Sequence, residues 1–413
     1  MPGSVSTRLQ RFNEFLTSPD SLTNKFYDLD DADADRTTAG MKNLDPAWSL
    51  RTGIYQAARN RYQNVLPWDN NRVKLRVADG MNDYINASPI VLQAPGMPAR
   101  RYIAAQGPTI TTVPHFWHML ATLADNFAVV VMLTRTKEGN REKCARYWPE
   151  DGELGQKLYA GPGFSYLVKL VQARRDPHAA CTIREFKLSG GSDGDGNMAA
   201  VDKTVVHLLF ESWNDFAALG KDQQKNFIAL LKIVNQYRSR TNLSFTEEQA
   251  PVVVHCSAGV GRSGTFISSD FLLSCIPGPS HSSLISSTSS PSSSSDDSRS
   301  HSHSSRVQTD RRFIIDSARF LYPSTTTTTT TTTTSSSSSS SSLSLPLKRF
   351  SISEHHNPSL LEKNNDDVAS HDPVFDTVSA LKKQRMLMVQ NANQYVFIYE
   401  IVRRVLAEVD ESV

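Results

Sequence analysis

Roughly a quarter of this chain cannot contribute to a hydrophobic core, which limits how the rest can fold. Residues 276–370 are rich in serine and threonine, with a threonine run at 325–334 and a serine run at 335–342. Such a segment buries too little apolar surface to offset the entropy lost on ordering, so we expect it to be disordered. Its apolar stretch at 311–322 is either a sticky piece of linker or a short partner-binding helix.

Amphipathic periodicity returns after this segment. Apolar residues at helical spacing predict two helices, one through Val374, Phe375, Val378 and Leu381 and one through Phe397, Ile401 and Val405. These helices have no core of their own and must pack on the region before residue 276. The segment 276–370 is therefore expected to be an insertion within a single domain, 1–413, whose core is about 20–275 and 372–408. Lengthening a loop from about ten to about a hundred residues costs only ~2 kcal/mol.

The region before the insertion alternates between strand and helix patterns. Short β-branched runs predict strands at Tyr102–Ala105, Ala128–Leu133, Val205–Phe210 and Val252–Val254. Helices are predicted at Val113–Leu123 and Asp222–Tyr237. Strands interleaved with helices favour an α/β or α+β fold over a sandwich.

Charge and composition argue against several classes of protein. The chain has 44 Lys and Arg against 42 Asp and Glu, which does not favour a nucleic-acid or membrane-surface partner. No apolar run of about 18 residues predicts a membrane span, and residues 1–16 predict a surface helix, not a signal peptide. The cysteines show no CxxC pairing, which fits a reducing compartment and no metal site; they are Cys144, Cys181, Cys256 and Cys275.

The segment 251–265 carries the strongest chemical signal. A buried strand at Val252–Val254 leads into a glycine-containing loop, and the loop leads into a helix expected to begin near Gly261. Cys256 is therefore expected at the exit of the strand, facing the helix N-terminus. Backbone N–H groups of residues 257–262 can form an anion-binding nest, and Arg262 can hold two phosphate oxygens. Cys256 at the focus of this positive field is expected to be a nucleophilic thiolate. An inert buried cysteine beside a flexible turn is the alternative, and the H-C-x5-R-S spacing argues against it.

This segment resembles the signature loop of the protein tyrosine phosphatases. Five further motifs, in order, resemble the tyrosine-specific, non-receptor and fungal-like branch: Asn60–Pro67, Asn82–Ala87, Gln106–Pro108, Lys143–Pro149 and Gln390–Gln394. The resemblance covers about residues 20–275 and 372–408. It implies a single α/β (α+β) phosphatase domain, with a central twisted mixed sheet flanked by helices and the signature loop between a strand and a helix N-terminus.

The resemblance also implies roles in a first chemical step. Cys256 would attack phosphorus and form a phosphocysteine, and Arg262 with the loop amides would stabilise the phosphoryl oxygens. Asp215 would be the general acid that protonates the leaving tyrosine oxygen. A surface aspartate without a catalytic role is the alternative for Asp215.

In a second step, Ser263 would hydrogen-bond the leaving thiolate, while Gln390 and Gln394 would position the hydrolytic water. The alternatives are an ordinary serine at a helix N-terminus and two polar residues on a helix surface.

Other residues would bind the substrate or support the site. Tyr62 would wall a pocket deep enough for phosphotyrosine, unless it is an ordinary half-buried tyrosine. The phosphate would contact Ser257, Ala258, Gly259, Val260, Gly261 and Arg262. His255 would set the environment of Cys256. Lys143 and Glu138 would brace Arg262 and the loop of the general acid, or else form a solvated charge pair.

The sequence departs from the family pattern at two places. The usual Trp-Pro-Asp is Trp213-Asn214-Asp215 here, and Asn214 lacks the fixed φ of proline, a restriction worth about 0.4–1 kcal/mol. We therefore expect this loop to close less readily. Asn64 stands where many members carry aspartate; it can accept a hydrogen bond from the substrate backbone but brings no charge.

The leading hypothesis is a cytoplasmic phosphotyrosine phosphatase, with access to the nucleus allowed, that needs no metal and no cofactor. Its partners would be phosphotyrosine-containing proteins, with MAP kinases as a family-level candidate, and it would be a monomer. One alternative is a phosphotyrosine-binding pseudophosphatase whose turnover is impaired by the Trp-Asn-Asp loop. Another is a dual-specificity phosphatase, against which the Asn60–Pro67 motif argues.

Overall fold

The computed structural model describes residues 5–16, 19–149, 155–191, 201–213, 219–240, 250–276 and 371–411. Apart from its first residue, the predicted insertion at 276–370 lies outside these ranges, as do the apolar stretch 311–322 and the predicted acid Asp215.

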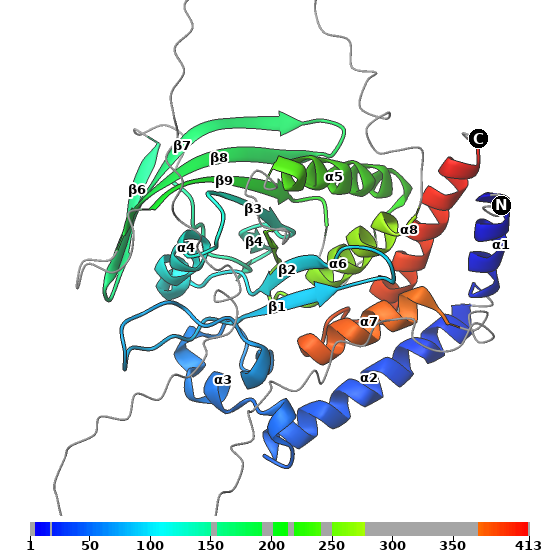
Figure 1. The fold of residues 1–413 in the computed structure, drawn as a ribbon, viewed down its shortest axis with the longest axis horizontal. Coiled ribbons are helices and arrows are strands. Elements are labelled where there is room, and N and C mark those ends of the chain that lie inside the picture. Colours follow the sequence, from blue (N-terminus) through cyan, green and yellow to red (C-terminus); the bar gives the residue numbers. More distant parts are fainter. Residues whose placement is uncertain are drawn as a thin grey trace, which may run out of the picture.

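A mixed eight-stranded sheet forms the centre of the molecule (Figure 1). Its strands are β1 (Ala87–Leu92), β2 (Arg100–Ala105), β3 (Phe127–Met132), β6 (Gln156–Gly161), β7 (Phe164–Asp176), β8 (Cys181–Gly191), β9 (Val201–Phe210) and β10 (Val252–His255). They lie in the order β1-β2-β10-β3-β9-β8-β7-β6, in which β2, β10, β3 and β9 are parallel to one another and the outer pairs are antiparallel. The short strands β4 (Lys137–Glu138) and β5 (Arg141–Glu142) form a separate hairpin.

Helices cover both faces of the sheet (Figure 1). On one face lies α4 (Val113–Ala121); on the other lie α5 (Lys221–Ser239), α6 (Gly261–Ser274) and α8 (Ala392–Asp410), with α1 (Val5–Glu14), α2 (Pro19–Met41) and α7 (Pro373–Gln384) packed outside them. The remaining helices are α3 (Arg51–Tyr55) and single 3₁₀ turns at Pro46–Trp48, Ala57–Arg59, Asp69–Asn71 and Ile110–Thr112. The predicted strands and helices are confirmed, and so is the α/β fold class.

Strand β3 illustrates how the core is divided. Val129 and Val131 face the side of α5 and α6, whereas Val130 and Met132 face the side of α4. This alternation follows from the two-residue period of a strand. A strand whose two faces are both covered by helices therefore needs apolar residues at consecutive positions.

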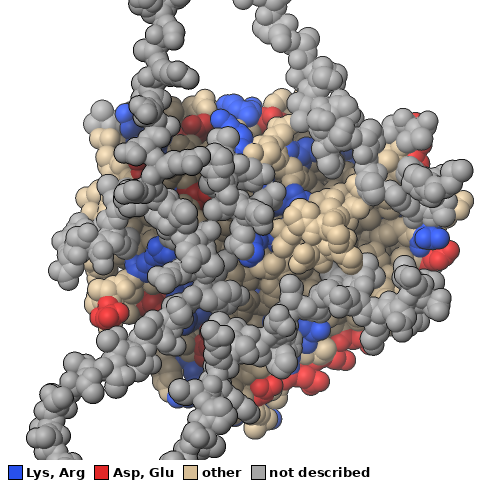
Figure 2. Space-filling model, viewed as in Figure 1, with Lys and Arg blue, Asp and Glu red and all other residues tan. Residues whose placement is uncertain are grey.

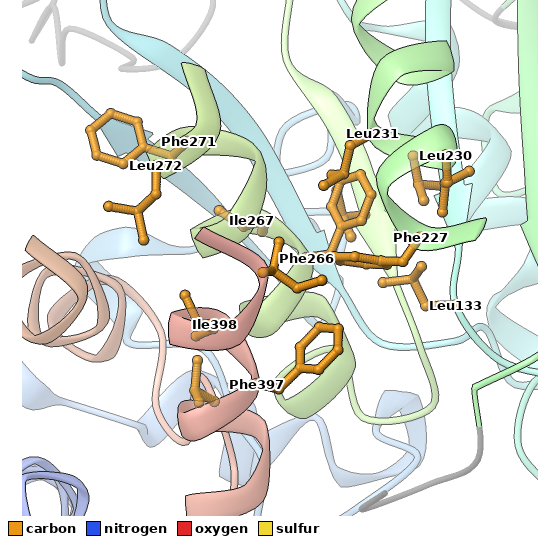
Figure 3. Packing of buried hydrophobic residues seen from close by; sticks show 14 of the residues in the cluster. Leu133, Phe227, Leu230, Leu231, Phe266, Ile267, Phe271, Leu272, Phe397 and Ile398 are labelled. Atoms are coloured by element: carbon orange, nitrogen blue, oxygen red, sulfur yellow. The ribbon is translucent and has the colours of Figure 1, made fainter. Parts of the chain in front are cut away.

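The helices around the signature segment interlock through aromatic rings (Figure 3). The ring of Phe227 in α5 lies 5.9 Å from that of Phe266 in α6 and 5.5 Å from that of Phe397 in α8, measured between centroids. Full burial of such side chains is worth about 1.5–3 kcal/mol each. Through Phe227, these contacts connect α8, which follows the predicted insertion, to α6, which precedes it.

Several parts of the fold were not predicted, among them β1, α3 and the β4–β5 hairpin. Strands β6, β7 and β8 extend the sheet as antiparallel ribbons, and helix α2 runs along the outside of α7 and α8. Its many aspartates obscure the helical signal, although Leu22, Phe26 and Leu29 have helical spacing and are buried. No helix within the described ranges is long and apolar enough to cross a membrane.

Candidate active site

The signature segment places Cys256 between the end of β10 and the start of α6. Cys256 is 3% exposed, and the backbone N–H of Gly259 donates a hydrogen bond to its Sγ over 3.2 Å. The N-cap of α6 is Val260, which has no polar side chain to satisfy the first N–H groups of the helix. These groups and the positive end of the helix dipole are therefore available to an anion beside Sγ.

Gly259 is required where the loop turns back against β2. Its φ is +74°, and a Cβ there would lie 2.0 Å from the carbonyl oxygen of Ala105. A second glycine, Gly107, lies on the opposite side, where a Cβ would be 2.6 Å from the carbonyl oxygen of Cys256. Any side chain at either position would displace the loop that carries the cysteine.

Arg385, which the sequence analysis missed, braces this loop from behind. Its buried guanidinium donates to the carbonyl oxygens of Gly259 (3.0 Å) and Ala258 (3.2 Å). It also donates to Asn86 Oδ1 (2.7 Å) and Ser88 Oγ (3.2 Å). Because C=O and N–H point in opposite directions across a trans peptide, holding these carbonyls turns the following amides the other way.

The charge of Arg385 persists at neutral pH. Burial lowers the pKa of its guanidinium to about 10, which leaves it protonated there. In the sequence, the only hint of this role is that Arg385 directly precedes the apolar residues 386–389, which suggests that it is buried. The residues that it would bind could not be named from the sequence.

Arg262 is oriented by the β4–β5 hairpin and by Trp213, which lies three residues after β9. Its Nη1 donates to Glu138 Oε1 over 2.7 Å and to the carbonyl oxygen of Trp213 over 2.9 Å. Lys143 Nζ lies 3.8 Å from Glu138 Oε2. The buried ring of Trp213 packs on Phe227 and Phe397. Trp213 is the last described residue before Asp215, so the structure gives no position for the predicted acid.

Tyr62 is fixed to the signature loop by a hydroxyl chain. The single hydroxyl proton of Ser257 goes to the carbonyl oxygen of Lys143 (2.8 Å), so its Oγ accepts from the hydroxyl of Tyr62 (2.8 Å). Asn64, from the same motif as Tyr62, is exposed.

His255 is neutral, and its two ring nitrogens hydrogen-bond to neighbouring groups. Burial lowers its pKa to about 4. Its Nδ1 lies 3.2 Å from the carbonyl oxygen of Cys256 and its Nε2 lies 2.7 Å from the hydroxyl of Tyr147. A carbonyl can only accept, so Nδ1 carries the proton and Nε2 accepts from Tyr147. The hydroxyl of Tyr147 therefore fixes the tautomer of the histidine that precedes the cysteine.

The two glutamines meet the N-terminus of α6. The side-chain Oε1 of Gln394 accepts from the backbone N–H of Gln390 over 2.9 Å. A Cβ on Gly261 would lie 3.0 to 3.1 Å from the amide groups of both side chains. Ser263 is buried in the first turn of the same helix, and its Oγ has no hydrogen-bond partner within the described ranges.

Within the described residues, the structure thus brings most of the predicted set together around one loop. The exceptions are Asn64, which is exposed, and Asp215, which lies outside the described ranges. No group of three or more His, Cys, Asp or Glu in those ranges is arranged to hold a metal ion.

The fold and the loop define an α/β protein with a cysteine-containing loop between a central parallel strand and a helix N-terminus. The sequence matches the family model described as Protein-tyrosine phosphatase over residues 56–289 and 359–404, more than half of the chain, and the chain belongs to that family.

Among curated proteins, the chain is similar to named tyrosine phosphatases. It is 36% identical to tyrosine-protein phosphatase non-receptor type 2 of Rattus norvegicus over 208 residues, which cover 50% of this chain and 44% of the rat protein. It is 34% identical to tyrosine-protein phosphatase 1 of Saccharomyces cerevisiae over 254 residues, 56% of this chain and 69% of the yeast protein. The chain thus spans less than half of the rat relative and about two thirds of the yeast one.

Proposed function

We propose that the chain hydrolyses phosphotyrosine in proteins through a phosphocysteine on Cys256. The observation that carries the proposal is the position of its Sγ, which accepts the Gly259 N–H beside the uncapped N-terminus of α6. Arg262, the second residue of α6, is oriented by Glu138 and supplies a fixed cation at the same helix N-terminus. Membership of the tyrosine phosphatase family supports the same reaction.

In the first step the sulfur–phosphorus bond forms and the bond from phosphorus to the tyrosine oxygen breaks. The electron pair of the broken bond goes to the phenolic oxygen, which takes a proton from Asp215. The guanidinium of Arg262 and the loop amides hold the three equatorial oxygens, where they stabilise the charge spread over the transition state.

In the second step a water oxygen bonds to phosphorus, and the electron pair of the sulfur–phosphorus bond returns to Cys256. The proton of the water passes to the Asp215 carboxylate, so the acid is regenerated. Gln390 and Gln394 position the water, and the hydroxyl of Ser263, which has no partner among the described residues, donates to the returning thiolate. The approach of both glutamines to Gly261 supports these roles.

Tyr62 would wall the pocket and favour phosphotyrosine over the shorter phosphoserine. The substrates would be phosphotyrosine-containing proteins, with MAP kinases among the candidates. The chain would act as a monomer in the cytoplasm.

We also propose that residues 276–370 are an insertion within one catalytic domain, which the packing of α7 and α8 against α6 supports.

The test is turnover of a phosphotyrosine peptide and of an aryl phosphate by the full chain and by Cys256→Ser. The variant is expected to lose turnover completely, because a serine hydroxyl is a far weaker nucleophile at neutral pH than a thiolate. Rapid acid quenching of the unmodified chain should trap phosphate on Cys256. Undiminished turnover by Cys256→Ser would refute the proposal.

The pseudophosphatase alternative rests on Asn214 and is decided in the same assay. Asp215→Ala is expected to be about 10² to 10⁴-fold slower than the unmodified chain, the usual worth of a general acid. Equally slow turnover by both would favour a binding protein. Equal rates on phosphothreonine and phosphotyrosine peptides would favour the dual-specificity alternative.

A further inference from the structure

Helix α2 carries exposed aspartates on its outer face and one buried aspartate on its inner face. Asp28, Asp31 and Asp35 are exposed, and red atoms follow the lower edge of the surface where α2 lies (Figure 2). Asp33 on the same helix is only 1% exposed. A buried carboxylate is costly unless it is paired and hydrogen-bonded, so its partners indicate what it does.

The partners of Asp33 lie on its own helix and at the end of α7. Its Oδ1 accepts from Arg36 over 3.3 Å. Its Oδ2 accepts from the Nζ of Lys382 over 3.4 Å and from the backbone N–H of Leu387 over 2.7 Å. The bond to Leu387 is the shortest of the three, and it attaches α2 to the loop between α7 and α8. Lys382 has a second carboxylate partner, Asp30, at 3.2 Å.

The loop that Asp33 holds has an unfavourable backbone. Leu387 has φ +60° and Val389 has φ +59°, a left-handed conformation that L-residues rarely adopt and β-branched ones least of all. Such a conformation persists only where surrounding contacts enforce it. Here the contacts are Asp33 on the N–H of Leu387 and the carbonyl oxygen of Val260, which accepts from the N–H of Val389 over 3.2 Å.

The next residue along this loop is Gln390, whose amide approaches Gly261 at the start of α6. The loop also lies close against α6, since a Cβ on Gly264 would be 2.5 Å from the backbone nitrogen of Val389. Release of Leu387 from Asp33 would therefore let the backbone relax and move Gln390 away from Gly261.

We propose that Asp33 is a positioning residue for the second chemical step, acting through the backbone N–H of Leu387 to hold Gln390 where the hydrolytic water must bind. This inference rests on the proposed function. It predicts that loss of the Asp33 carboxylate slows hydrolysis of the phosphocysteine more than its formation, since Cys256 and Arg262 are held by other residues.

The experiment is stopped-flow kinetics with para-nitrophenyl phosphate on the full chain, with Asp33→Ala, Asp33→Asn and Asp30→Asn. The first turnover reports formation of the phosphocysteine, and the steady state reports its hydrolysis. For Asp33→Ala we expect a first turnover within about twofold of the unmodified chain, followed by a steady-state rate lower by about tenfold or more. Asp33→Asn keeps an oxygen that can accept from Leu387 and should recover part of the loss.

Asp30→Asn is the matched control, because Asp30 pairs with the same Lys382, whereas the N–H of Leu387 donates to Asp33. It should behave like the unmodified chain. The assignment is overturned if Asp33→Ala slows both phases equally, if it slows neither, or if Asp30→Asn has the same effect. Should Asp33→Ala not fold, Asp33→Asn decides, with a selective loss in the steady state expected. An unmodified chain that releases no nitrophenol would instead refute the proposed function.

Discussion

Arg385 shows how a single buried side chain can fix the direction of several peptide groups. It makes four hydrogen bonds, two of them to carbonyl oxygens of the signature loop. The guanidinium presents donors in a rigid planar fork, which can span oxygens that lie apart. A lysine has one compact ammonium and cannot reach all of them.

At this residue we predict that Arg385→Lys lowers kcat/KM for an aryl phosphate by about 10- to 100-fold, because buried hydrogen bonds from a charged donor are worth ~1.5–3 kcal/mol each. Much of the loss should appear as a higher KM, since misdirected amides bind the phosphate less well. Arg403→Lys, an exposed change on α8, is the control and should be silent. Unaltered kinetics for Arg385→Lys would show that the loop keeps its shape without the guanidinium.

Buried polar residues such as Arg385 could not be assigned a role from the sequence. Cys256 and Arg262 were identified because strand, loop and helix follow one another directly in the chain. Arg385, Asp33 and Tyr147 were not, because each acts on a segment far away in the sequence and their types alone suggest only polar surface.

Among the secondary-structure elements, the β4–β5 hairpin is very short but positions a key residue of the site. It contributes only four paired residues, yet one of them, Glu138, places a carboxylate on the buried Arg262. The hairpin thereby converts a mobile cation into a fixed one. From the sequence alone, Glu138 and Lys143 could also form a solvated charge pair. In the structure both are half-buried, and Glu138 contacts Arg262.

We predict that Glu138→Gln raises the KM for an aryl phosphate and lowers kcat/KM by about tenfold, since a charge-assisted bond worth ~1.5–3 kcal/mol is replaced by a neutral one. Glu142→Gln on the same hairpin is the control. Its carboxylate pairs with Arg61 and is 50% exposed, so little change is expected. Equal losses in the two variants would mean that the hairpin as a whole, rather than the Glu138 charge, is responsible.

For the whole molecule, buried and half-buried histidines determine how the stability of the fold responds to acid. Burial lowers the pKa of His115 and of His255 to about 4, and places that of His207 well below its ordinary value. A histidine of the unfolded chain has a pKa near 6.5, so the unfolded chain binds more protons at mildly acidic pH. The stability that these neutral histidines contribute is therefore fully present above about pH 6.5 and is lost as the pH falls toward 4.

We predict that the free energy of unfolding, measured by urea titration, falls by about 2 kcal/mol from His255 alone between pH 7.5 and pH 5. His207→Leu should lose less over this interval, because one of the titrating groups is gone. Neither ring nitrogen of His207 has a hydrogen-bond partner within the described ranges, so the variant should also be no less stable at pH 7.5. A pH-independent unfolding free energy would contradict this account.

The sequence by itself determined the four parallel strands β2, β3, β9 and β10, the helices packed on them, the family and the signature loop, since each depends on residue types at short spacing. Only the tertiary structure decided which distant side chains complete the site. Glu138 and Arg262, Arg385 and Gly259, and Asp33 and Leu387 are separated by 124, 126 and 354 residues. Hydrophobic patterning favours burial without naming partners, whereas a hydrogen bond needs its two atoms within about 3 Å, and only packing supplies that.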